Sequence, residues 1–245
     1  MKIQKFTKNR KAELTTKQLV MIIVLIVSFI IVLFLLFRLN LGETTNKEVC
    51  HNSVVLKGRL PLGGPLDCRT NYLCISGDGD CGEIPTTSTI EVDSNNKNET
   101  MKALADEMSN CWWMFGEGKI RYTGGAGSTG VHCALCSVIE FSGISADSIS
   151  YQKFYDYLRT TSKSESQTYL HYLYEINNLD LFESQEQIEI NLLSDVISTN
   201  QKYSIITGID NNLIDFLGDD EWLKVYIIPT LETSATECDK FITKA

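Results

Sequence analysis

Residues 19–37 form an uninterrupted uncharged run, LVMIIVLIVSFIIVLFLLF, in which the only hydroxyl belongs to Ser28. As a helix rising about 1.5 Å per residue, this run would be roughly 28 Å long, close to the ~30 Å hydrocarbon core of a bilayer. A soluble core helix is rarely so long and apolar on every face. A cleaved signal peptide has an apolar region of only about 7–15 residues and a small-residue cleavage site, whereas this run ends in RLNLG. The sequence therefore predicts an uncleaved, single-pass signal anchor over residues 19–38.

Charge is distributed unevenly around this run and sets its expected orientation. The first 17 residues hold six basic groups and one acid, a net charge of +5, while the rest of the chain carries −14. Because basic segments stay on the cytoplasmic side of a membrane, we expect a cytoplasmic N-terminus and an extracytoplasmic C-terminal part at the cell membrane. The acidic body argues against nucleic-acid binding, since it would repel a phosphate backbone. The expected organisation is a basic cytoplasmic tail (1–18), the anchor (19–38), a polar stalk (39–48) and a Cys-rich domain (49–245).

The residues before the apolar run allow a second interpretation. Lys11-Ala12-Glu13-Leu14, followed by polar residues and the long apolar helix, resembles the cleavage pattern of archaeal type IV pilin-like precursors. The resemblance covers about the first 37 residues of the chain. It implies cleavage after Ala12 and packing of the apolar helix into a filament core, which would make the chain a pilin-like subunit.

All eight cysteines follow the apolar run. An even number of cysteines confined to the exported part of a chain indicates a disulfide framework. The sequence leaves the connectivity open, because eight cysteines can be paired in many ways. The disulfide candidates are Cys50, Cys68, Cys74, Cys81, Cys111, Cys133, Cys136 and Cys238.

Cys133 and Cys136 also have the spacing of a redox-active or zinc-binding pair. A redox pair would make the chain an envelope thiol–disulfide oxidoreductase, with His132 lowering the pKa of a neighbouring thiol. Such a pair usually lies at a helix N-terminus, whereas the β-branched residues after Cys136 predict a strand. Zinc would need a second ligand pair at a fixed spacing, and Cys50-His51 does not form one. We therefore predict no metal and no cofactor, and we keep the oxidoreductase as an alternative.

No other motif specifies a reaction. Residues 124–130 have the glycine spacing of a dinucleotide fingerprint, but a strand rather than a helix is expected after them. Asn98-Glu99-Thr100 is a glycosylation sequon, so Asn98 is a candidate modification site on the exported side. The sequence favours a binding or structural role in the cell envelope over catalysis. The expected partners are the lipid bilayer, through residues 19–37, and another envelope protein.

Residue patterns in the exported part predict an α+β fold. In the strongest helix, over residues 100–115, Leu104, Met108 and Cys111 share one face, and we assign Asp106 and Glu107 to the other. A capping box starting at Ser162 predicts the start of a further helix. The other expected helices are 150–160, 165–176 and 184–198, and the expected strands are 53–59, 72–76, 131–141, 203–209 and 222–229.

Three segments together carry a family resemblance. They are residues 50–53 (CHNS), 111–119 (CWWMFGEGK) and 203–208 (YSIITG). With them the chain resembles uncharacterised single-pass membrane proteins of small-genome archaea, from the apolar helix to the carboxyl end. The resemblance implies membrane anchoring and an archaeal source, and it assigns no catalytic residue.

Overall fold

The computed structural model describes residues 16–38, 41–60, 64–123, 130–145, 148–177, 196–211, 221–230 and 238–244. The chain divides into two compact units, Met1–Thr44 and Thr45–Ala245. In the first unit, the apolar run lies within helix α1 (Thr16–Arg38), whose side chains are exposed from residue 18 to residue 34. Among the described residues, no helix is both long enough and apolar enough to cross a membrane.

Helix α2 (Leu41–Arg59) includes residues 53–59, so the strand predicted there was wrong. The helix also includes residues 41–48 of the predicted stalk. Cys50 and Val54, four residues apart, are buried in the core of the second unit. Gly58, four residues further on, lies so close to Ile120 that any Cβ there would overlap its side chain. The β-branched residues of this segment favour a strand locally. The helix prevails because it places Cys50, Val54 and Gly58 on one packed face.

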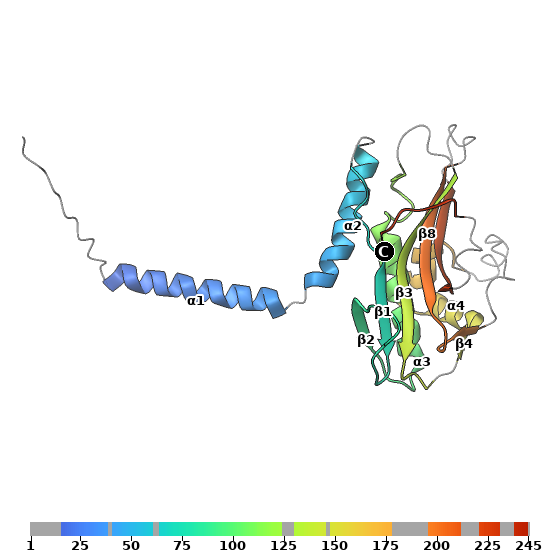
Figure 1. The fold of residues 1–245 in the computed structure, drawn as a ribbon, viewed down its shortest axis with the longest axis horizontal. Helices are drawn as coiled ribbons and strands as arrows, with labels where there is room; N and C mark the ends of the chain where they lie inside the picture. Colours follow the sequence, from blue (N-terminus) through green and yellow to red (C-terminus); the bar gives the residue numbers. More distant parts are fainter. Residues whose placement is uncertain are drawn as a thin grey trace, which may run out of the picture. The chain divides into compact units, whose positions relative to one another are not determined.

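A six-stranded mixed sheet is the centre of the second unit, and Figure 1 shows β1, β3 and β8 side by side in it. β1 runs parallel to β2 and β3, while β8 runs antiparallel to β3 and β9. The strand order is β2-β1-β3-β8-β9, and β10 pairs with the first part of β3. The strands are β1 (Asn71–Ser76), β2 (Ser88–Glu91), β3 (Gly130–Ser142), β8 (Tyr203–Asn211), β9 (Glu221–Pro229) and β10 (Lys240–Phe241).

Three helices pack with this sheet around one hydrophobic core, so the predicted mixed α+β class is confirmed. They are α3 (Lys97–Met114), α4 (Tyr151–Thr160) and α5 (Tyr169–Tyr174). Leu104 and Met108 of α3 are fully buried, as are Leu73 of β1 and Ile139 of β3. Two small ladders complete the unit. They pair β4 (Ser148–Ser150) with β7 (Val196–Ser198), and β5 (Ser162–Ser164) with β6 (Gln167–Thr168).

Two predicted helices are corrected in part. The helix predicted over 165–176 begins only at Tyr169, as the short α5, and the β5–β6 hairpin precedes it. The N-cap of α5 is Thr168, whose side chain accepts a hydrogen bond from the His171 backbone N–H. The predicted capping box at Ser162 was therefore wrong. Of the predicted helix 184–198, residues up to 195 lie outside the described part, and Val196–Ser198 is strand β7.

Two buried tyrosine hydroxyls from the helices cap the edge strand β9. Tyr174 OH donates to Val225 O at 2.7 Å, and Tyr151 OH donates to Ile227 O at 3.3 Å. β9 is the last strand in the sheet order. Within the described part of the chain β9 has no second neighbour, and free backbone groups on an edge strand are a template for pairing with another chain. The two tyrosines occupy two carbonyl groups of this strand.

We expect Tyr174→Phe to lower the free energy of unfolding by about 1–2 kcal/mol, because it removes a hydroxyl donor from a buried carbonyl. Tyr122→Phe is the matched control. Tyr122 is 1% exposed, and within the described part of the chain its hydroxyl has no hydrogen-bond partner. Its removal should therefore be neutral or stabilising. Urea unfolding measures both variants, and equal losses would contradict the capping role.

Candidate functional site

All eight cysteines are joined in four disulfides, which confirms the predicted framework. The structure also decides the connectivity, which the sequence left open. One bridge joins α2 to the segment before β1, one closes the loop after β1, one joins α3 to β3, and one ties the C-terminal segment to β3. The pairs are Cys50–Cys68, Cys74–Cys81, Cys111–Cys136 and Cys133–Cys238.

Cys133 and Cys136 are bonded to different partners rather than to each other. Side chains alternate between the two faces of a strand, so positions three apart in β3 point to opposite sides of the sheet. The same alternation puts His132 on the face opposite Cys133. The oxidoreductase alternative requires a Cys133–Cys136 disulfide, and the geometry argues against it. A zinc site at this pair is argued against as well, because zinc binds cysteine thiolates and both cysteines are in disulfides.

A β-bulge brings two neighbouring residues of β3 to helix α3. Leu135 is paired with Ile206 and Ser137 with Ile205, so Cys136 is the extra residue. Without the bulge, Cys136 and Ser137 would point to opposite faces. With it, Cys136 bonds to Cys111 of α3, and the Ser137 hydroxyl donates to a carboxylate one helical turn earlier.

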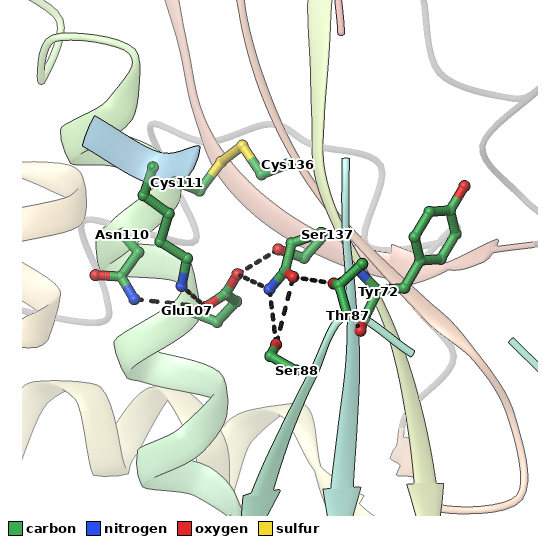
Figure 2. Close-up of polar contacts among 10 residues, drawn as sticks. Tyr72, Thr87, Ser88, Glu107, Asn110, Cys111, Cys136 and Ser137 are labelled. Atoms are coloured by element: carbon green, nitrogen blue, oxygen red, sulfur yellow. Dashed lines mark hydrogen bonds and ion pairs between the residues drawn. A yellow bond between two sulfur atoms is a disulfide. The ribbon is translucent and has the colours of Figure 1, made fainter. Parts of the chain in front are cut away.

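That carboxylate belongs to Glu107, which is 2% exposed and lies at the centre of a polar network (Figure 2). Lys47 Nζ of α2 lies 2.8 Å from Glu107 Oε2. Asn71 Nδ2 of β1 donates to Oε1 at 3.2 Å, and Asn110 Nδ2 donates to Oε2 at 3.4 Å. With the Ser137 hydroxyl, these donors come from two helices and two strands.

The network extends to strand β2 through Asn71. The Asn71 amide is hydrogen-bonded to Ser88, and its Oδ1 also accepts from the Thr87 hydroxyl. Thr87 in turn accepts from the Tyr72 backbone N–H at 2.8 Å. The polar chain therefore links α2 and α3 to the parallel half of the sheet.

The electrostatics hold Glu107 ionised. Burial by itself raises the pKa of a carboxyl. The Lys47 ammonium and the hydrogen bonds from Ser137 and Asn71 outweigh this effect and bring the pKa of Glu107 below its ordinary value. Because its oxygens are already occupied by donors, the carboxylate is suited to holding elements together rather than to abstracting a proton.

Glu107 is buried on the same face as Leu104, so its predicted place on the other face of the helix was wrong. A signal for its burial was present, because Glu107 lies three residues after Leu104 and four before Cys111. This spacing places Glu107 on the same face of α3 as Leu104 and Cys111. Asp106, by contrast, is partly exposed: it accepts from Tyr169 OH and lies 2.6 Å from Lys102 Nζ.

A separate open cavity of about 620 Å³ lies at the carboxyl ends of β1 and β2. One of its carboxylates, that of Glu99 in the first turn of α3, accepts from the Asp93 backbone N–H at 2.8 Å. The cavity is acidic and would favour cationic over anionic groups. Among the described residues, no three His, Cys, Asp or Glu side chains are grouped so as to hold a metal ion. The lining carboxylates are Asp78, Asp80, Glu91, Asp93 and Glu99.

Two further predicted sites are the glycosylation sequon at Asn98 and the cleavage position at Ala12. Asn98 is exposed, but it lies in the first turn of α3 rather than in a loop. The hydroxyl of the sequon's Thr100 is buried. The pilin-like cleavage position at Ala12 lies outside the described residues, so that interpretation stays a prediction.

Comparison with known proteins adds no relative. No family model, no curated protein and no solved structure matches this chain. The resemblance to archaeal single-pass membrane proteins therefore stays a prediction.

Proposed function

We propose that the chain is a membrane-anchored extracytoplasmic protein with a binding or structural role in the cell envelope. The observation that carries the proposal is the complete set of four disulfides, with no free cysteine, in the part of the chain after the apolar run. Disulfides persist mainly in oxidising compartments outside the cytoplasm.

The uncharged run 19–37 and the basic residues before it support the anchor and its orientation. The run has the length of a bilayer core. The +5 segment before it satisfies the positive-inside rule, and the acidic remainder has no basic segment of comparable strength. In this arrangement the second unit is exported and its cysteines meet an oxidising environment.

A double substitution, Ile26→Lys with Ile30→Lys, should release the full chain from membranes. A lysine at the centre of a spanning helix costs about 2.5–3.5 kcal/mol, so two should prevent stable insertion. The matched control is Ser162→Lys with Ser164→Lys, which adds the same charge to the exposed strand β5. Carbonate extraction measures the result: wild type and control should stay in the pellet, and the Ile26/Ile30 variant should not.

Orientation is tested separately by fusing alkaline phosphatase, which is active only outside the cytoplasm, to the carboxyl end of the full chain. We expect an active fusion. An inactive fusion, or a wild-type chain fully extracted by carbonate, would overturn the proposal.

A further inference from the structure

Helix α2 is apolar on two opposite faces. Cys50 and Val54 are buried in the core, as described above. Val49, Leu56 and Leu60 are instead 39%, 53% and 55% exposed. Leu60 directly follows α2, and its backbone N–H still donates to Leu56 O at 2.9 Å. The three are separated by seven and four residues, so at about 100° per residue they lie on one face, roughly opposite the buried one. We refer to Val49, Leu56 and Leu60 as the α2 stripe.

Basic residues flank the α2 stripe. The half-buried Lys57 and the exposed Arg59 follow Leu56 by one and three residues, which places them on either side of the stripe at about 80° from it. Long basic side chains beside an apolar stripe are the pattern of helices that lie in a membrane interface. Two acidic residues also lie near the stripe: Glu48 precedes Val49, and the Asp67 backbone N–H donates to the Ser53 hydroxyl of α2 at 3.1 Å.

The segments bonded to α2 continue the same pattern. Cys68 is joined to Cys50, and Lys244 donates its backbone N–H to Cys68 O at 2.9 Å. Beside these contacts, Phe241 of β10 is 42% exposed. Three basic side chains on these segments are exposed, namely Arg69, Lys240 and Lys244, and Lys244 Nζ lies 3.5 Å from Asp67 Oδ1.

The charge of these segments differs from that of the rest of the molecule. The chain after residue 17 has a net charge of −14. Residues 48–69 and 238–244 nevertheless hold five basic groups against three acidic ones. Of the five exposed large apolar residues that the structure describes outside α1, four lie on these segments, and the other is Val196. Apolar exposure and positive charge therefore coincide on the segments around α2.

We propose that the α2 stripe, with its flanking Lys57 and Arg59, lies on a bilayer of anionic lipids, so that the second unit rests on the membrane surface. The inference rests on the proposed membrane anchoring and goes beyond it. Charge complementarity favours an anionic bilayer over a second copy of the chain as the partner of the stripe. Basic residues on both sides of the stripe attract anionic headgroups, whereas in a pair of α2 helices they would bring like charges together.

The test uses the full chain in vesicles of phosphatidylcholine and phosphatidylglycerol, with the photo-crosslinker benzoylphenylalanine replacing one residue at a time. Leu56 probes the stripe, and Leu25 in α1 probes the anchor. Lys163, an exposed residue of β5, is the control position. Mass spectrometry identifies the adducts. We expect lipid adducts at positions 25 and 56 and none at position 163.

The basic residues are tested by adding Lys57→Glu and Arg59→Glu to the Leu56 probe. Lipid adducts at position 56 should fall about fivefold or more, since each basic residue near an anionic surface changes affinity by roughly that factor. Near-ultraviolet circular dichroism checks that this variant is folded.

Each outcome has a distinct meaning. Adducts at position 25 without adducts at position 56 would overturn the surface contact and leave the anchor standing. No lipid adduct at either position would overturn both. Crosslinks from position 56 to a second copy of the chain would also overturn the proposal, in favour of self-association.

Discussion

Replacing Cys133 and Cys238 together by alanine should lower the free energy of unfolding by about 4–5 kcal/mol. The bridge joins residues 105 apart in the sequence, the longest separation of the four. A disulfide stabilises mainly by restricting the unfolded chain, and the restriction grows with the length of the loop. The change should also release β10, which pairs with β3 at His132 and Cys133.

The Cys74–Cys81 bridge is the matched control, because it spans only seven residues. Its removal should cost about 2–3 kcal/mol on the same reasoning. Denaturant unfolding of both double-alanine variants under non-reducing conditions gives the comparison. A loss for Cys74/Cys81 equal to or larger than that for Cys133/Cys238 would show that loop length does not control stability here.

Lys47→Met should lower the free energy of unfolding by about 3–5 kcal/mol, because it leaves the buried Glu107 carboxylate without its cation. The direct contact is 2.8 Å, and the lysine side chain is 17% exposed. Removing both charges with Lys47→Met and Glu107→Gln should recover much of the loss, since the amide keeps the size of the carboxyl without the buried charge. Urea unfolding of the two single variants and the double variant forms the mutant cycle.

Additive losses in that cycle would mean that the two residues act independently, and would contradict the network described above. The exposed pair Lys102 and Asp106 supplies a control of similar chemistry, with side chains 61% and 41% exposed. Because exposed pairs contribute only about 0–1 kcal/mol, Lys102→Met should have a small effect.

The same carboxylate predicts how stability depends on pH. The pKa of Glu107 is lower in the folded chain than the value of about 4.3 expected in the unfolded chain. The unfolded state therefore binds its proton first as the pH falls. The contribution of Glu107 is fully present above the unfolded pKa and is lost as the pH falls through the folded pKa. Wild type should lose stability across this acidic range, and Glu107→Gln should lose less.

The elements with strong periodicity could be predicted from the sequence. The helix expected at 100–115 is α3 (Lys97–Met114), and the strand expected at 131–141 is β3 (Gly130–Ser142). Strand 203–209 is likewise β8 (Tyr203–Asn211). In these segments, the pattern of apolar residues matches the period of the element and faces the common core.

The elements that depend on distant partners could not be predicted in this way. Val54-Val55 favours a strand locally, yet α2 is helical because Cys50, Val54 and Gly58 pack on the second unit. The burial of Glu107 likewise depends on residues that are distant in the sequence. A carboxylate on an apolar face is tolerated only where donors converge on it, and its donors come from segments as far away as Lys47 and Ser137.

By itself, the sequence determined the unequal charge of its two ends, the apolar run between them and the presence of cysteines on one side of that run only. It also determined the main elements of the α+β fold. Only the tertiary structure decided which cysteines pair. A disulfide needs two Cβ atoms within about 4 Å. For Cys133 and Cys238 that proximity comes from β10 pairing with β3, and for Cys136 and Cys111 it comes from the packing of β3 and α3 in one core.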